Sequence, residues 1–288
     1  MSGVAVVTDS TSSLAPDVAD RAGVVVVPLQ VIVDGTSRPE SFRPSAGTLS
    51  PGAVAAALRE GRTVSTSRPS PEAFDLAYAA AAERGATSIV SVHLSGAISS
   101  TVDAAELAAR SASIPVTVVD SRTVAAACGF AALAAASAAR YGAGAEEVAG
   151  IARRRAAGAS TYFCVESLEY LRRGGRIGAA QALLGSALAV KPLLTVTDGR
   201  ITPYERVRTM SRALARLEEL AAEALAGSTG GADVAVVHLD NRSAADRLAR
   251  TLRGRDAGGV SVTVSEISAV LGVHCGPGTV GVVVSPLD

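Results

Sequence analysis

The sequence predicts an α/β protein of two domains, divided into residues 1–160 and 161–288. In the first half, short continuous apolar runs such as residues 4–7 and 116–119 alternate with helical patterns, which is typical of a parallel sheet covered by helices on both faces. The chain has 288 residues, close to the ~250–300 residues at which a single core usually stops growing. A Gly-Ala-Ser break at residues 158–160 interrupts the helical pattern, and a more mixed α/β domain is predicted after it.

The elements of the first half follow the order expected for such a sheet. A strand at residues 4–7 ends in the polar run 8–13, and a helix is predicted behind it at 14–22. Residues 34–63 are rich in Pro, Gly, Ser and Arg around one helix at 51–59, and form either a lid or a surface excursion. Ligands bind at the carboxyl ends of parallel strands, so the polar loops at those ends are the first candidates for a site. The other predicted strands cover 24–33, 89–92 and 116–119, and the other helices cover 71–83, 101–110, 123–141 and 145–157.

The second half is organised around residues 168–208, which join the two domains. A short helix there ends at Gly174 and Gly175, which supply positive φ, and Asp198-Gly199 predicts a β-hairpin. The helix between these features, at residues 179–188, is almost entirely Ala, Leu and Gly, so it is buried on more than one side or lines an apolar cavity. The remaining predicted elements are strands at 161–165, 234–239 and 260–264 and helices at 210–225 and 243–252.

Composition excludes several classes of protein. The formal net charge is zero and aromatic residues make up 3% of the chain, which argues against nucleic acid as a ligand. No apolar run approaches the ~20 residues of a membrane span, and the N-terminus lacks a signal-peptide pattern. Cys128, Cys164 and Cys275 have no C-x-x-C spacing, which fits reduced thiols better than disulfides or zinc. We therefore expect a cytoplasmic protein with no transmembrane segment and no metal.

Two motifs resemble catalytic or nucleotide signatures and fail their context tests. Residues 276–281 match G-x-G-x-x-G, but a strand follows them where the dinucleotide fingerprint requires a helix, so these glycines are better explained by a tight turn. No phosphate loop of the G-x-x-x-x-G-K-[ST] type is present. Ser95 lacks both outer glycines of the hydrolase nucleophile motif, and we interpret it as a helix cap. A stand-alone hydrolase or small-molecule kinase-like enzyme using Ser95 and His274 remains the alternative function.

Three segments that we predict to be loops supply small hydrogen-bond donors beside helix starts or glycines. These are Thr66-Ser67, Ser95-Gly96 and His274. Helix N-termini present unpaired N–H groups and a partial positive charge, so two of them aimed at one point bind an anion. Each Ser or Thr could instead simply cap its own helix. Together the three segments favour a ligand with one small anionic end, which a sugar-binding or amino-acid-binding protein would also satisfy without explaining the apolar helix.

Ordered motifs along nearly the whole chain resemble the DegV family of fatty-acid-binding proteins. Two departures are Arg68, where the family usually has Gln, and Ala97-Ile98, where it tends to have Thr-Tyr. The motifs are Thr8-Asp9-Ser10-Thr11, Thr66-Ser67-Arg68-Pro69-Ser70-Pro71, Leu94-Ser95-Gly96, Val119-Asp120-Ser121, Leu168-Glu169-Tyr170-Leu171-Arg172-Arg173-Gly174-Gly175-Arg176-Ile177, Lys191-Pro192-Leu193-Leu194, Asp198-Gly199, Val207-Arg208 and His274-Cys275-Gly276-Pro277-Gly278.

The resemblance implies the family's EDD fold, with one long-chain fatty acid in a tunnel between the domains and no cofactor. It implies that Thr66, Ser95 and His274 hold the carboxylate, with Ser67 and Gly96 alongside. It also implies a non-catalytic subunit of a bacterial fatty acid kinase, which presents the lipid to a separate ATP-binding subunit for acyl-phosphate formation. From the apolar helix and its start we take Ile177, Leu183, Leu184 and Leu188 as candidate tunnel-lining residues.

Arginines cluster around the joining segment and are either a solvated face or a docking site for the kinase. Clustered arginine suits an acidic protein surface. The candidates are Arg172, Arg173, Arg176, Arg206 and Arg208.

Overall fold

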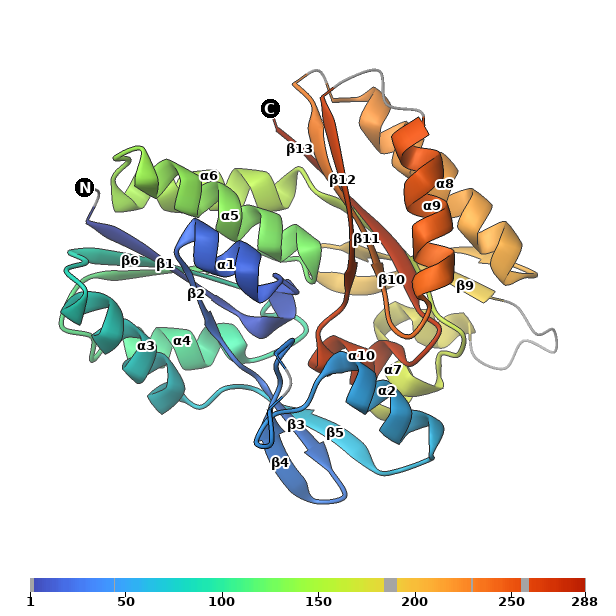
Figure 1. The fold of residues 1–288 in the computed structure, drawn as a ribbon, viewed down its shortest axis with the longest axis horizontal. Helices are drawn as coiled ribbons and strands as arrows, with labels where there is room; N and C mark the ends of the chain where they lie inside the picture. The colour runs from blue at the N-terminus through green and yellow to red at the C-terminus, as the bar shows by residue number, and fades with distance from the viewer. Residues whose placement is uncertain (1–2, 44, 184–190, 229, 255–258, 288) are drawn as a thin grey trace.

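The protein is an α/β molecule with three sheets in the part of the chain that the structure describes (Figure 1). This computed structural model describes residues 3–43, 45–183, 191–228, 230–254 and 259–287. The strand orders are β2-β1-β6-β7, β10-β9-β8-β13-β11-β12 and β4-β3-β5. The predicted α/β class, with a parallel sheet in the first half and a mixed sheet in the second, is confirmed.

The first sheet is parallel throughout and is covered on both faces. It consists of β1 (Val4–Asp9), β2 (Val24–Val27), β6 (Ser88–His93) and β7 (Val116–Asp120). Neighbouring strand residues point to opposite faces, so Val6 packs against one helical layer and Val7 against the other. Figure 1 shows the two layers on opposite sides of the sheet. One layer holds α1 (Pro16–Ala22), α5 (Ala126–Arg140) and α6 (Ala145–Ala157), and the other holds α3 (Pro71–Glu83) and α4 (Thr101–Ala109).

The prediction of one strand over residues 24–33 is wrong. The chain forms β2 and then β3 (Gln30–Val33), which belong to different sheets. Pro28 lies between them, and because proline has no N–H to donate to a ladder, it favours a break in the pairing. Strand β3 pairs antiparallel with β4 (Thr36–Pro39) and with β5 (Val64–Ser67), neither of which was predicted as a strand. Helix α2 (Pro51–Arg59) forms as predicted within this excursion.

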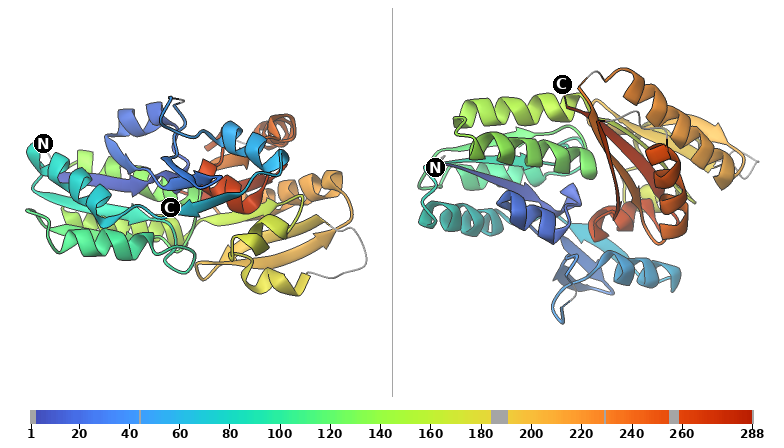
Figure 2. Two further views of the ribbon diagram at one scale, coloured as in Figure 1. Left: turned by 90° about the horizontal axis from the view of Figure 1, so that it is seen from below. Right: turned by 45° about the horizontal axis from the view of Figure 1, so that its top comes forward.

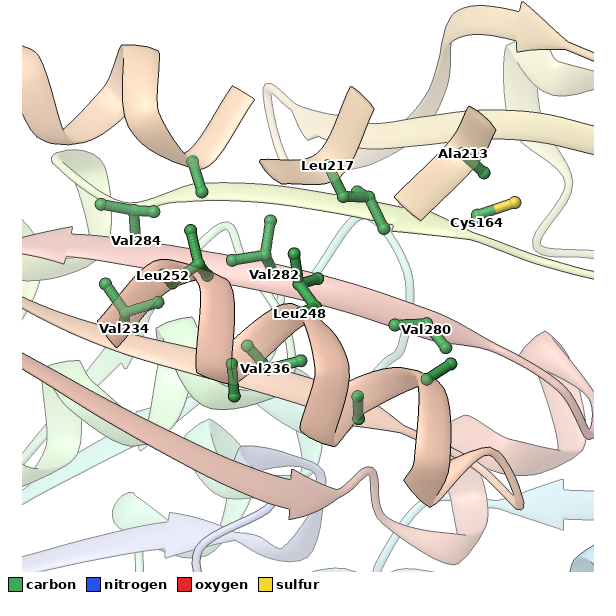
Figure 3. Packing of buried hydrophobic residues seen from close by; sticks show 14 of the residues in the cluster. Cys164, Ala213, Leu217, Val234, Val236, Leu248, Leu252, Val280, Val282 and Val284 are labelled. Atoms are coloured by element: carbon green, nitrogen blue, oxygen red, sulfur yellow. The ribbon is translucent and has the colours of Figure 1, made fainter. Parts of the chain in front are cut away.

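The second sheet is mixed, as predicted. Strand β13 (Val280–Pro286) runs antiparallel to both of its neighbours, β8 (Ser160–Cys164) and β11 (Ala232–His238). Strand β12 (Val260–Glu266) is parallel to β11. Figure 3 shows how Leu217 of α8 (Met210–Ala226) and Leu248 of α9 (Arg242–Gly254) pack onto the valines of this sheet. Two more strands, β9 (Lys191–Thr197) and β10 (Arg200–Val207), complete one edge.

Helix α5 packs against both large sheets, which explains its unusual composition. It contacts β1 and β6 on one side and β11 and β13 on the other, and the views in Figures 1 and 2 place it between the two halves. Ala131 and Ala135 are fully buried among the first-sheet valines, while Ala126 and Ala127 pack near Val283 of the second sheet. Sheets on two sides leave room only for small side chains at native packing density.

The joining segment differs in part from its prediction. Helix α7 (Glu169–Arg173) is followed by the 3₁₀ helix η2 (Gly178–Leu183), where an α-helix over 179–188 was expected. Gly178 has φ of 50°, and a Cβ there would lie 2.8 Å from the Ile201 carbonyl oxygen, so close packing against β10 constrains this start. Residues 184–190, with Leu184 and Leu188, lie outside the described residues. The predicted hairpin at Asp198-Gly199 is confirmed, with positive φ at both turn residues as a type I′ turn requires.

Gly175 has the positive φ predicted for it, 69°, whereas Gly174 keeps a helical φ of −74°.

No helix in the described part of the chain is long and apolar enough to cross a membrane.

We expect Leu217→Ala to lower the free energy of unfolding by about 2–5 kcal/mol, because its side chain is fully buried between α8 and the second sheet. Leu76→Ala is the matched control on another helix, since Leu76 is 74% exposed, and should change stability by less than about 0.5 kcal/mol. Urea unfolding followed by circular dichroism measures both. Equal losses would contradict the packing described here.

Candidate functional site

Two of the predicted carboxylate ligands meet although they are 208 residues apart in the chain. The Thr66 hydroxyl oxygen lies 2.9 Å from Nε2 of His274. Thr66 is on strand β5, and His274 is near the end of helix α10 (Ala269–Cys275). The expectation that both residues lie in loops is therefore wrong. Regular elements hold side chains more firmly than loops do, so the pair is fixed by the contact between β5 and α10.

The imidazole of His274 is tightly enclosed. A Cβ on Gly174 would lie 2.0 Å from Nδ1 of His274, so only glycine allows helix α7 to approach the ring this closely. Nδ1 is buried and has no hydrogen-bond partner among the described residues. Burial, with a smaller contribution from the nearby charge of Arg176, lowers the pKa of His274 to about 4. The ring is consequently neutral at physiological pH, with one N–H to donate.

The other end of α10 is anchored by a buried carboxyl group that sequence reasoning missed. Glu40 accepts a hydrogen bond from the Val270 N–H at 2.7 Å and another from the Ser10 hydroxyl. Ser268 caps the helix by accepting the Leu271 N–H at 3.2 Å. Burial raises the pKa of Glu40 to about 7. A single acidic residue in a Pro- and Ser-rich excursion carries no sequence signal of such a role.

The hydrogen bonds of Ser95 are made with residues other than Thr66 and His274. It is fully buried and donates to the carbonyl oxygen of Gly199 at 2.7 Å, in the hairpin turn of the second half. Its oxygen also accepts the Ala97 N–H at 3.2 Å. The interpretation of Ser95 as the cap of α4 is wrong, because α4 begins at Thr101 and has no side-chain cap. The Gly96 N–H donates to Asp120 at 3.2 Å.

A buried polar network holds the loop that carries Ser95. One oxygen of Asp9 lies 2.9 Å from Nδ1 of His93 and accepts the Leu94 N–H at 3.1 Å. The other oxygen accepts the Thr11 N–H at 3.0 Å. Nε2 of His93 is 2.7 Å from the Ser91 hydroxyl. The motif that begins at Thr8 therefore fixes the ends of β1 and β6 from within the core and does not face the Thr66–His274 pair.

Two adjacent cavities meet at this pair. Thr66, Arg176 and His274 line both of them. The smaller has a volume of about 260 Å³ and the larger about 460 Å³. Ser67 and Ile98 line the smaller cavity, whereas Ser95 and Gly96, which lie between Leu94 and Ile98 in the chain, do not contribute to it directly. The other residues lining the smaller cavity are Leu29, Arg68, Leu94, Ser99, Ser100, Val270 and Leu271.

An apolar cluster adjoins the smaller cavity. Ile177 and Leu183, two of the candidate tunnel residues, are buried in it together with Leu194 and Ile201. Ile98 packs against this cluster and also lines the smaller cavity. Ile98 therefore links the apolar cluster to the cavity that Thr66 and His274 line.

The candidate docking arginines lie in different settings. Arg172 and Arg173 both pair with Glu169 at 2.7 Å. Arg176 donates to the carbonyl oxygens of Gly174 at 2.6 Å and Ile98 at 3.3 Å. The other two are exposed on and beside β10: Arg206, which donates to the Ala182 carbonyl oxygen at 3.4 Å, and Arg208.

The G-x-G-x-x-G match is a turn that packs against α7, as interpreted from the sequence. It follows α10 and ends within β13, which begins at Val280, and Gly276 and Gly278 both have positive φ. Cβ atoms there would lie 2.2 Å from the ring of Tyr170 and 2.6 Å from Glu166. No group of three or more metal-ligating side chains occurs among the residues that the structure describes.

Comparison with known proteins identifies the family. The family model described as "Uncharacterised protein, DegV family" matches residues 3–287. The chain belongs to the DegV family. A DegV domain-containing protein of Streptomyces coelicolor is 51% identical over 282 residues, which are 98% of each chain. One from Deinococcus radiodurans is 40% identical over 99% of each chain.

Solved structures of DegV proteins share the whole fold. A DegV family protein from Thermus thermophilus, described for its fatty acid binding, matches with a TM-score of 0.91 at 34% identity over 100% of both chains. DegV from Bacillus subtilis, described as a fatty acid binding protein, matches with a TM-score of 0.89 at 29% identity over 99% of both chains. The expected family membership is thus confirmed over the whole chain.

We expect the His274 ring to titrate with a midpoint near pH 4, well below the value of ~6.5 for a free histidine. Because the unfolded chain binds this proton more readily, the contribution of His274 to stability is present above about pH 6.5 and is lost as the pH falls towards 4. Nitrogen NMR shifts of the ring measure the midpoint, and the signals of His274→Gln identify the resonance among the three histidines. A midpoint near 6.5 would contradict the enclosed environment.

Proposed function

We propose that this DegV protein binds one long-chain fatty acid and places its carboxylate in the smaller cavity, against Thr66 and His274. The observation that carries this proposal is the hydrogen bond between Thr66 and His274. It lies in the wall of a cavity that is also lined by arginines and that adjoins an apolar cluster. The fatty-acid-binding descriptions of the relatives from T. thermophilus and B. subtilis support it.

The energetics of such a ligand fit this arrangement. About 15 buried methylenes at ~0.8 kcal/mol each give ~12 kcal/mol before ordering costs. A carboxylate buried without donors would cancel much of that gain. Thr66, Ser67 and the neutral ring of His274 can each donate a hydrogen bond, while Arg68 and Arg176 add positive charge. In the proposed complex Ile177 and Leu183, which are buried in the apolar cluster, contact the acyl chain.

Ser95 and Gly96 belong to the proposed head-group site as secondary members. They lie in the chain between Leu94 and Ile98, which both line the smaller cavity. The hydrogen bond from Ser95 to Gly199 ties this loop to the β9–β10 hairpin. We propose that this hydrogen bond holds the two halves of the chain in a fixed relative position around the ligand. We propose that these halves are domains of residues 1–160 and 161–288, a boundary that falls one residue after the start of β8, the first strand of the second sheet, at Ser160.

We also propose that the protein does not transfer phosphate itself but presents the carboxylate to a separate ATP-binding kinase subunit. A carboxylate oxygen would attack the terminal phosphorus of ATP, and the bond from that phosphorus to the leaving ADP oxygen would break. The product would be an acyl phosphate. The exposed residues Arg172, Arg173, Arg206 and Arg208 suit docking to an acidic surface.

The alternative, a hydrolase that uses Ser95 and His274, is less well supported. The Ser95 hydroxyl donates to Gly199, and Nε2 of His274 pairs with Thr66. Within the described residues no hydrogen bond joins the two side chains, which nucleophilic catalysis by a Ser–His pair requires.

We expect delipidated protein to bind palmitate at one molecule per chain, and Thr66→Val to weaken this binding by roughly tenfold to a hundredfold. Valine keeps the shape of threonine and removes one hydrogen bond to a charged group, which is worth ~1.5–3 kcal/mol. Native mass spectrometry gives the stoichiometry, and calorimetry gives Kd.

Thr36→Val on the exposed strand β4 is the matched control and should leave binding unchanged. Methyl palmitate keeps the tail and loses the anion, so it should bind much more weakly than palmitate. Equal affinity for the ester and the acid would rule out the carboxylate site.

The kinase role is tested by mixing palmitate-loaded protein, ATP and a purified ATP-binding fatty acid kinase subunit, and trapping the acyl phosphate with hydroxylamine. We expect product only when the subunit is present. Arg206→Glu should slow product formation severalfold without changing the Kd for palmitate, because a reversed charge repels an acidic partner. Palmitate-dependent ATP hydrolysis by the DegV protein alone would contradict the proposal.

A further inference from the structure

The larger cavity is lined by three arginines, of which the proposed carboxylate site uses only Arg176. Arg62, Arg173 and Arg176 line it, and none of the described residues that line it is acidic, although Arg62 and Arg173 each pair with a carboxylate beside it. The protein as a whole has no net charge, so this concentration is local. Exposed hydroxyl groups of Thr63 and Ser65 and the ring of Tyr170 complete the polar part of the wall.

The three arginines are held in place by other groups. Arg62 pairs with Asp34 at 2.8 Å, and Arg173 pairs with Glu169 at 2.7 Å. Arg176 is held by carbonyl oxygens and forms no ion pair within the described part of the chain. An arginine fixed in this way presents its remaining N–H groups in a preset direction, which suits an oxyanion with several acceptor oxygens.

The two cavities touch where the ligand head group would lie. Thr66, Arg176 and His274 form the wall that they share. A group attached to a carboxylate held by Thr66 and His274 therefore has the smaller cavity and apolar cluster on one side and the larger cavity on the other. The larger cavity, at about 460 Å³, is open to a group bulkier than a carboxylate.

We propose that the larger cavity is a phosphoryl site, which holds the phosphate of a lipid acyl phosphate beside Arg62, Arg173 and Arg176. This inference rests on the proposed function and deepens it. A phosphoryl group near pH 7 carries between one and two negative charges and three terminal oxygens, which matches three arginines better than a single carboxylate does. In this arrangement Arg173 and Arg176 contact the phosphoryl group of the product, Arg173 is removed from the proposed docking residues, and Arg172, Arg206 and Arg208 remain.

Arg62 gives the sharpest test, because it lines only the larger cavity. The probe is 2-oxoheptadecylphosphonate, in which a methylene replaces the bridging oxygen of palmitoyl phosphate so that the head group is not hydrolysed. Calorimetry on delipidated protein gives its Kd and that of palmitate. We expect Arg62→Gln to lower the preference for the phosphonate, expressed as the ratio of the palmitate Kd to the phosphonate Kd, by roughly fivefold or more.

Arg43→Gln is the matched control. Arg43 is likewise a half-exposed arginine paired with a single carboxylate, that of Asp20, and it lines neither cavity. Its substitution should leave the ratio unchanged. A ratio that is the same in Arg62→Gln and in the parent protein would overturn the phosphoryl site, as would an equal drop in both variants.

Inorganic phosphate separates a lipid-linked phosphoryl group from free phosphate. At constant ionic strength, millimolar phosphate should weaken binding of the phosphonate and leave binding of palmitate unchanged. Equal competition against both lipids would place phosphate at the carboxylate site and overturn the inference. Failure of the parent protein to bind palmitate would instead defeat the proposed function itself, so the two failures are distinguishable.

Discussion

The position of helix α10 is the constraint on which the candidate site depends. Its seven residues pack against α2, β3 and β5 from the first half and against α7 from the second. The Ser13 hydroxyl accepts the Ser268 N–H at 3.0 Å, and Glu40 accepts the Val270 N–H. The first turn of the helix is thus fixed by residues far away in the sequence, and its last turn delivers His274 to Thr66. A helix this short has little stability of its own, so tertiary contacts determine where it lies.

The same helix contacts two buried groups whose neutral forms are favoured by burial. Burial lowers the pKa of His274 and raises that of Glu40. The contribution of His274 to stability is lost as the pH falls from about 6.5 towards 4. That of Glu40 is present below its unfolded pKa of about 4.5 and is lost as the pH rises towards 7. The two contributions to the free energy of unfolding change in opposite directions as the pH rises, and their pH ranges overlap. They partly cancel, so burying both groups does not make the stability depend steeply on pH.

The sequence predicted the regular elements well where one periodicity dominated. Helices α3 and α6 have the predicted bounds, because their apolar spacing and flanking residues agree. The break at Pro28, by contrast, required knowledge of which sheet each strand joins. The 3₁₀ geometry after Gly178 depends on a close contact with Ile201 that no local pattern encodes. At Pro28 and after Gly178, tertiary packing rather than local propensity determines the secondary structure.

For the site, residue type was more informative than position. The motifs marked Thr66, Ser95 and His274, and the family resemblance implied that they lie together, but spacing alone says nothing about a contact across 208 residues. The partner of Ser95 could not be predicted, because it is a backbone carbonyl in a hairpin of the other half. Glu40 and Arg62 belong to no motif. Their roles follow from the way the excursion folds against α10 and α2.

The distance along the chain between Thr66 and His274 has a consequence for biosynthesis. All four strands of the first sheet precede residue 121, so this sheet can form while translation continues. The pair that lines both cavities is complete only after a further ~8–30 s, the time needed to add residues 121–274 at ~5–20 residues per second. A nascent chain therefore has a folded first sheet well before it has a binding site, and a lipid that requires both residues is captured only by a chain that is nearly finished.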